Sequence, residues 1–197
     1  MKSVGVVGGI GSGKTTVCKV WEKLGATVIY ADDLAKELMQ TDSELQKKLV
    51  TIFGSDTYNS DGSLNKPHLI NEAFNKNRVD ELNKAVHPVL REKLKELAGS
   101  SKKAGEELFV VEAAILLNEG RPDFPEIIVL VTADRDRRFE RVAKRDQASG
   151  DEILARMDKQ PDFKSLTHLA DFTIKNDGAL SELEESAVNL FEELKST

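Results

Sequence analysis

Residues 4–17 read VGVVGGIGSGKTTV, a run of branched apolar residues followed by closely spaced glycines, a lysine and two threonines. Glycine costs backbone entropy wherever it lies, so a cluster of glycines needs a local reason. Gly8, Gly13, Lys14 and Thr15 match the G-x-x-x-x-G-K-[ST] pattern in full, with an apolar stretch before it and a helical pattern after it. The stretch therefore predicts a strand, a phosphate-binding loop and a helix in succession.

In this motif, the P-loop, backbone N–H groups and a helix N-terminus bind phosphate groups. The lysine reaches the β- and γ-phosphates, and the next hydroxyl group is a ligand of Mg²⁺. The dinucleotide fingerprint G-x-G-x-x-G is excluded, because Lys14 occupies the position of its third glycine. We expect Thr15 to be the metal ligand. The expected nucleotide-binding residues of the loop are Gly9, Ile10, Gly11, Ser12, Gly13, Lys14, Thr15 and Thr16.

Apolar segments bounded by turn residues recur along the chain, with helical patterns between them. They cover residues 3–7, 26–31, 108–113 and 127–132, with a weaker one at 172–174. Continuously apolar strands that alternate with helices are typical of a parallel sheet covered on both faces. The expected fold is α/β, a three-layer P-loop NTPase core. Residues 179–195 predict an amphipathic helix whose buried face is Leu180, Leu183, Ala187, Leu190, Phe191 and Leu194.

The interval between the second and third expected strands is too long for one crossover helix. Its apolar residues recur at helical spacing, and Pro88 is expected in the first turn of a new helix. Residues 99–107 are expected to be a linker. We therefore expect a nucleotide-binding core at residues 1–32 and 104–197, and an inserted helical acceptor-binding lobe at 33–103. The apolar positions expected to pack in this lobe include Leu38, Leu45, Leu49 and Phe53.

A basic segment follows the fourth expected strand. Arg138, Arg141 and Arg145 share one helix face, and planar guanidinium groups suit triphosphate oxygens. A Ser-Gly break follows at residues 149–150, so residues 138–160 are expected to form a helical lid over the nucleotide, with 147–151 mobile when no ligand is bound. The alternative is a solvated face on which the arginines pair with neighbouring acids.

Asp32 and Asp33 close the second expected strand. Ligands of open parallel sheets lie beyond the carboxyl ends of the strands, so a carboxylate here can accept the proton of an incoming hydroxyl group. The alternative is that one of the two acids caps the following helix.

The composition limits the class of protein. The chain has 197 residues, 40% of them hydrophobic and 31% charged, which fits a globular protein. The net charge of −6 disfavours nucleic-acid binding, and the one cysteine, Cys18, excludes a disulfide framework within the chain. No apolar run approaches the roughly 20 residues that span a bilayer. We expect a cytoplasmic protein without a membrane or an obligatory protein partner.

Three classes of P-loop protein compete. A GTPase would carry N-K-x-D and D-x-x-G motifs, and neither occurs. A mechanical or DNA-working ATPase usually needs larger domains. The inserted lobe and the basic segment favour a kinase of a small hydroxylated acceptor; the remaining alternative is a regulatory nucleotide-binding protein with slow hydrolysis.

Further blocks occur in a fixed order after the loop: GATVIYADDLAKEL, FGSDTYNSDGSLNKPHL, HPVLR, RVAKRDQAS and ADFTIKNDG. Together with residues 4–17 they cover nearly the whole chain, and this ordered set resembles the dephospho-coenzyme A kinases. The resemblance implies transfer of the ATP γ-phosphoryl group to the ribose 3′-hydroxyl group of dephospho-coenzyme A, with Mg²⁺ as cofactor.

The resemblance also implies roles for single residues. Lys14, Asp32 and Arg145 would be catalytic, with Asp32 as the proposed base. Arg138 and Arg141 would bind the nucleotide, and Asn176 and Gly178 would lie near the adenine. The acceptor-binding positions would be Asp32, His87, Arg91 and Glu112.

Some positions depart from the family pattern. Tyr30 replaces the first Asp of a D-A-D motif, and residues 112–119, EAAILLNE, replace D-x-P-L-L-F-E. Glu112 is expected to reach Mg²⁺ through water. For His87 two interpretations stay open, contact with substrate or packing before Pro88.

Overall fold

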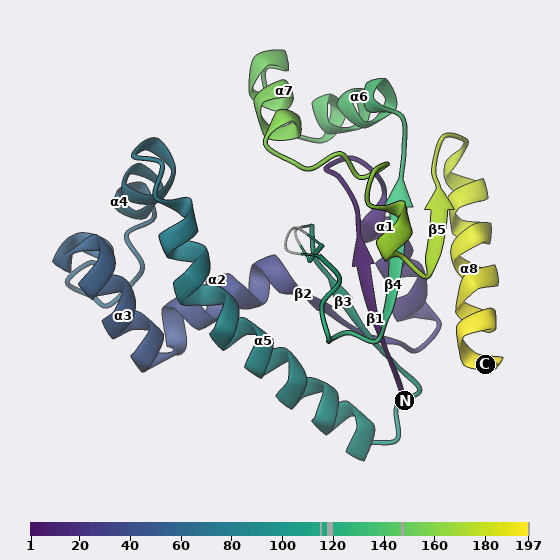
Figure 1. The fold of residues 1–197 in the computed structure, drawn as a ribbon, viewed down its shortest axis with the longest axis horizontal. Coiled ribbons are helices and arrows are strands. Elements are labelled where there is room, and N and C mark those ends of the chain that lie inside the picture. Colours follow the sequence, from purple (N-terminus) through teal and green to yellow (C-terminus); the bar gives the residue numbers. More distant parts are fainter. Residues whose placement is uncertain (115, 118–119, 147, 197) are drawn as a thin grey trace. The chain divides into compact units, whose positions relative to one another are not determined.

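The computed structural model describes residues 1–114, 116–117, 120–146 and 148–196. Five parallel strands form one sheet in the order β2-β3-β1-β4-β5 (Figure 1). The central strand β1 pairs with β3 on one side and with β4 on the other. The predicted α/β fold is confirmed. The strands are β1 (Lys2–Val7), β2 (Thr27–Tyr30), β3 (Leu108–Glu112), β4 (Ile127–Thr132) and β5 (Phe172–Lys175).

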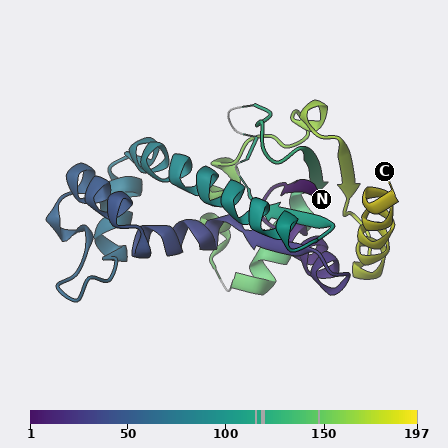
Figure 2. The same ribbon diagram turned by 90° about the horizontal axis from the view of Figure 1, so that it is seen from below.

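One face of the sheet is covered by helices α1 (Lys14–Lys23) and α8 (Leu180–Ser196). Trp21 of α1 is fully buried, and its Nε1–H donates to Ala187 O of α8 at 2.7 Å. Figures 1 and 2 both show α8 running beside β5 at one edge of the sheet. The predicted apolar face of α8 is buried except for Leu180, which is 62% exposed because the helix begins there, beyond the packed face.

The opposite face of the sheet is covered by irregular segments. Leu117 and Phe163 pack there against Val7, Ile128 and Leu130. The sheet is thus buried on both faces, as its continuously apolar strands predicted. The helices α6 (Arg135–Asp146) and α7 (Gly150–Asp158) follow β4 and are separated by the predicted break, where Ser149 and Glu152 form a capping box. A short 3₁₀ helix (Thr167–Leu169) precedes β5.

The chain divides into two compact units, one formed by Met1–Tyr30 with Ala98–Thr197 and the other by Ala31–Leu97. These divisions fall a few residues before the boundaries expected from the sequence, residues 33 and 104. The second unit holds several helices, as its length predicted, and Asp42 caps one of them by accepting the N–H of Leu45 at 2.8 Å. Its elements are α2 (Ala31–Thr41), α3 (Ser43–Phe53), a 3₁₀ helix (Ser55–Thr57), α4 (Lys66–Ile70), a π-helix (Asn71–Asn75) and most of α5 (Val79–Lys103).

The expected helix start at Pro88 is wrong, because Pro88 lies inside α5. Proline removes one backbone hydrogen bond, but buried side chains on both sides of it, including Val86 and Leu94, keep the helix continuous. The helix also continues through residues 99–103, so only residues 104–107 of the expected linker connect α5 to β3. None of the helices in the described part of the chain combines the length and the apolarity needed to cross a membrane.

Candidate nucleotide-binding site

The glycine loop joins the end of β1 to the start of α1. Gly13 lies immediately before α1 with φ +106°, and Gly11 has φ +75°, a region that L side chains rarely adopt. A Cβ atom at Gly11 would collide with the backbone of Arg138, and one at Gly13 with the side-chain amide of Asn176. These glycines therefore let two distant segments approach the loop closely.

Lys14 and Thr15, the first residues of α1, both contact the carboxylate group of Glu112 at the end of β3. Thr15 Oγ1 donates to Glu112 Oε2 at 3.1 Å, and Lys14 Nζ lies 3.8 Å from Glu112 Oε1. Lys14 Nζ also donates to Gly9 O at 3.3 Å, and the residue is only 8% exposed. The structure thus holds an ammonium group, a hydroxyl group and a carboxylate group together beside the loop.

The metal expected from the sequence fits this arrangement of oxygen atoms. A hydroxyl and a carboxylate oxygen are hard ligands of the kind that Mg²⁺ prefers. Among the described residues, no group of three or more His, Cys, Asp or Glu side chains could hold a metal ion. A magnesium ion at Thr15 would therefore need phosphate oxygens and water to complete its coordination, as is usual for Mg²⁺ at nucleotides.

Asn176, the residue after β5, ties the loop to the neighbouring strand ends. Its Nδ2 donates to Ser12 O at 2.7 Å, and its backbone N–H donates to Thr132 O at 2.8 Å. Its Oδ1 accepts from Arg141 at 3.1 Å. This side chain is buried and supports the loop backbone. Ser12 Oγ is also buried, and within the described part of the chain it has no hydrogen-bond partner.

Two of the three predicted arginines of α6 reach the loop. Arg141 Nη1 donates to Gly11 O at 3.5 Å, and the Arg138 guanidinium group lies where a side chain at Gly9 would be. Burial lowers the pKa of Arg138, and the like charge of Arg135 adds to this effect. Arg145 is exposed and forms two hydrogen bonds with Asp146, at 2.6 and 3.1 Å, which matches the alternative interpretation of paired surface charges.

The sequence reasoning missed Gln160, which follows α7. Its Oε1 accepts the backbone N–H of Ile10, inside the loop, at 2.8 Å. No motif marks this glutamine, and its only sequence signal is its position at the end of the expected lid.

Other predicted positions lie nearby. Gly178 lies between β5 and α8, where a Cβ atom would collide with Glu182. Tyr30 is the register partner of Glu112, and burial, followed by the charge of Glu22, raises its pKa, so its hydroxyl group stays neutral. Burial likewise raises the pKa of the Cys18 thiol. The departures at Asn118 and Glu119, and Gln147 of the expected mobile segment, lie outside the described residues.

Three predicted residues belong to the second unit. Asp32 lies in the first turn of α2, which begins at Ala31, so neither acid occupies the capping position before the helix. Asp33 pairs with Lys36 at 2.7 Å, whereas Asp32 is exposed. His87 and Arg91 lie one turn apart on α5, His87 partly buried and Arg91 exposed.

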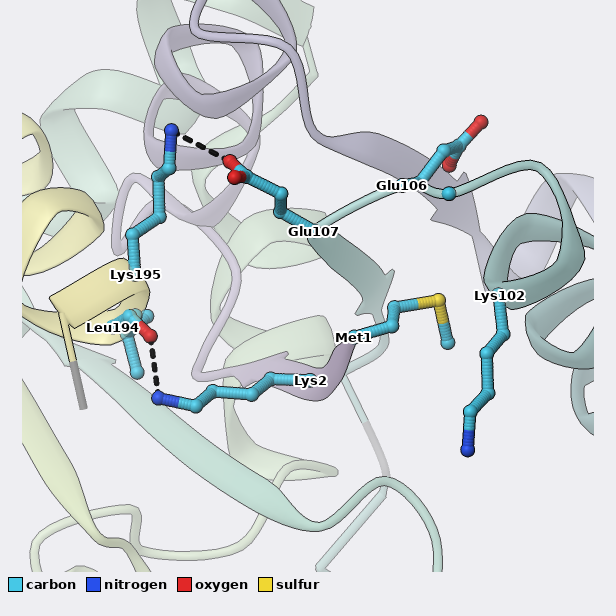
Figure 3. A pocket seen from close by; sticks show the side chains of 8 residues that line it. Met1, Lys2, Lys102, Glu106, Glu107, Leu194 and Lys195 are labelled. Atoms are coloured by element: carbon cyan, nitrogen blue, oxygen red, sulfur yellow. Dashed lines mark hydrogen bonds and ion pairs between the residues drawn. The ribbon is translucent and has the colours of Figure 1, made fainter.

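A pocket at the amino ends of β1 and β3 lies at the opposite end of these strands from the loop (Figure 3). Several of its charged side chains have partners among the residues that line it. Lys195 pairs with Glu107 at 2.6 Å, and Lys2 Nζ donates to Leu194 O at 2.6 Å. This pocket contains none of the predicted site residues.

Comparisons with known proteins agree across nearly the whole chain. A family model described as dephospho-CoA kinase matches residues 2–182. A dephospho-CoA kinase of Salinibacter ruber is 37% identical over 192 residues, covering 97% of this chain and 96% of its own. A dephospho-CoA kinase of Chlorobium luteolum is 32% identical, with coverages of 95% and 88%. A crystal structure of a Thermus thermophilus protein superimposes with a TM-score of 0.79 at 28% identity, covering 98% and 97%.

Proposed function

The chain belongs to the dephospho-CoA kinase family, and we propose on this basis that it transfers the γ-phosphoryl group of ATP to the ribose 3′-hydroxyl group of dephospho-coenzyme A. Within the structure, the phosphoryl-donor side of the proposal is supported by the cluster of Lys14, Thr15 and Glu112 beside a glycine loop at the end of β1. Such a cluster is suited to a triphosphate and its metal ion.

In the proposed reaction, the acceptor oxygen forms a bond to the γ-phosphorus while the bond from that phosphorus to the β,γ-bridging oxygen breaks, releasing ADP. The loop N–H groups and Lys14 stabilise the charge on the phosphoryl oxygens during transfer. Arg138 and Arg141 bind the triphosphate, and Mg²⁺, held by Thr15 with Glu112 nearby, would neutralise phosphate charge when bound. Arg145 would join them when residues 138–160 close as a lid.

The proposal assigns the acceptor proton to Asp32. Because the transition state of phosphoryl transfer is usually loose, this base orients the hydroxyl group and takes its proton late. His87 and Arg91 would contact the acceptor, and the second unit would form its binding lobe. Asn176 supports the loop, with Gly178 near the adenine. ATP is the proposed donor, and the cytoplasm is the proposed location, as is ordinary for an ATP-dependent kinase of a small molecule.

The test is a single assay with purified protein, ATP, Mg²⁺ and dephospho-coenzyme A, in which ADP and coenzyme A are both quantified. We expect equal amounts of the two products, and no turnover when Mg²⁺ is chelated. Coenzyme A itself, whose 3′-hydroxyl group is already phosphorylated, is the matched control acceptor, and with it we expect no ADP to be released. ADP release without coenzyme A would contradict the proposal and favour the regulatory alternative with slow hydrolysis.

A further inference from the structure

Ile10 of the glycine loop is held by residues 138–160 through both its backbone and its side chain. Its backbone N–H donates to Gln160 Oε1 at 2.8 Å. Its side chain packs against the buried cluster of Val142, Ile153 and Met157. Because a backbone N–H can only donate, the atom of Gln160 that faces it must be the amide oxygen. Backbone and side chain of Ile10 are thus both held by the segment expected to form the lid.

The geometry of the loop explains why Ile10 needs an outside acceptor. Ile10 is the second residue of a tight turn, which is closed by the N–H of Ser12 donating to Gly9 O at 3.1 Å. Gly11, the third residue, has φ +75°, as a type II turn requires. The N–H of Ile10 takes no part in the turn's own hydrogen bond. Left without a partner in this partly buried position, it would destabilise the turn.

Gln160 is itself fixed where α7 ends. Its backbone N–H donates to Met157 O at 3.2 Å, and Met157 is 5% exposed within the same apolar cluster. A Cβ atom at Gly9 would meet both the Arg138 guanidinium group and, at 3.3 Å, Gln160 Oε1. The amide and the guanidinium group therefore approach the same bend of the loop.

We infer that Gln160 is a positioning residue, which holds the Ile10 amide so that the loop keeps the curvature that binds the triphosphate. It also links that curvature to the placement of α6 and α7. The inference rests on the proposed function only in taking ATP as the ligand of the loop. Because Gln160 acts through the loop backbone and not on the reacting atoms, its loss affects ATP binding more than the transfer step.

The kinetic test is Gln160→Met, which keeps the length of the side chain and removes the acceptor. We expect the KM for ATP to rise about two- to tenfold, the effect of one hydrogen bond. The kcat should fall by less than about twofold, because the lost contact acts on binding and not on the transfer step. The KM for dephospho-coenzyme A should not change. Lys159→Met alters the exposed neighbouring residue and is the matched control, which should leave the KM for ATP unchanged.

The direct test is amide hydrogen exchange at Ile10, followed by NMR in the protein without nucleotide. Exchange should be faster in Gln160→Met than in the wild type, and Gln160→Glu, which keeps an acceptor oxygen, should restore protection. Unchanged exchange in Gln160→Met would overturn the inference. So would an unchanged or lower KM for ATP, or a lowered Tm with equal losses in every kinetic parameter. A wild-type protein that does not phosphorylate dephospho-coenzyme A would instead refute the proposed function. The exchange experiment uses no nucleotide, so it would still show whether Gln160 holds the Ile10 amide.

Discussion

Arginines serve the two ends of the sheet in different ways. At the amino ends of β4 and β5, Arg121 forms two hydrogen bonds with the Asp171 carboxylate group, at 3.0 and 2.7 Å. At the carboxyl ends, Arg141 donates to Gly11 O and to Asn176 Oδ1, neither of which carries a charge. The Arg121 guanidinium group is paired with a carboxylate group of the same chain, whereas among the described residues no carboxylate group forms an ion pair with Arg141 beside the loop. The difference separates an arginine that stabilises the fold from one that is available to an anionic ligand.

The largest effect at the carboxyl end of the sheet is expected from Lys14→Ala, which removes the buried ammonium group at the loop. Loss of a charge aimed at the transferring group should lower kcat by about 10³-fold or more. The fold should stay intact, which circular dichroism and thermal unfolding would verify. A kcat equal to that of the wild type would exclude the loop as the phosphate site.

The next largest effect is expected from Asp32→Asn, which keeps the size of the side chain and removes the proton acceptor. The kcat should fall by about 10²–10³-fold if Asp32 is the base. A carboxylate in the first turn of α2 also interacts favourably with the helix dipole, so a loss of up to about 1 kcal/mol in stability is expected.

Three measurements on Asp32→Asn separate its possible roles: kcat, the Kd for ATP and the dependence on Mg²⁺. A metal ligand would raise the Mg²⁺ requirement, with rescue at high concentration. A residue that only stabilises the helix would leave kcat within about twofold of the wild type, below the range for a lost base. Asp33→Asn, which breaks the pair with Lys36, is the matched control.

A paired substitution at the two arginines addresses the comparison itself. Arg141→Met should raise the KM for ATP about tenfold, as expected for a lost charged hydrogen bond, and should cost about 1 kcal/mol of stability because the buried Asn176 Oδ1 loses its donor. Arg121→Met should leave the KM unchanged and lower the stability by about 1 kcal/mol, because the pair is partly exposed. If Arg121→Met also raised the KM for ATP, or Arg141→Met left it unchanged, the distinction between the two ends of the sheet would be lost.

The smallest effect concerns pH. Hydrogen bonding to Arg121 lowers the pKa of Asp171, and the N–H of Ile128 adds to this effect. A carboxyl group whose pKa is lower in the folded state stabilises the fold above its unfolded pKa, and this contribution is lost as the pH falls through the folded pKa. The Tm difference between the wild type and Asp171→Asn should therefore shrink as the pH falls from about pH 5 toward pH 2. A difference independent of pH would show that the charge contributes nothing.

Much of the fold could be predicted from the sequence, because it depends on local patterns. Continuous apolar runs located the five strands, and the glycine loop fixed the first strand and helix. The break at Ser149 follows from a capping residue next to glycine. Where a local rule failed, packing overrode it, since proline usually begins a helix but buried residues on both sides of Pro88 carry α5 through it.

Less of the candidate site could be predicted, because its contacts join residues far apart in the chain. Helical spacing put Arg138, Arg141 and Arg145 on one face, but it could not show that Arg145 would pair with Asp146. The contact between Gln160 and Ile10 spans 150 positions and has no motif. Asn176 was expected near the adenine from a resemblance, and the structure adds that its amide supports Ser12.

Trp21 has a consequence for experiments on this protein. It is the one tryptophan of the chain, fully buried, and its indole N–H is bonded to α8. Its fluorescence should therefore be shifted to shorter wavelengths in the native state and should report the docking of α8 on the helix that begins at the phosphate loop. Unfolding of the unit that contains the sheet can then be followed optically without a label, while events confined to residues 31–97 would leave this signal unchanged.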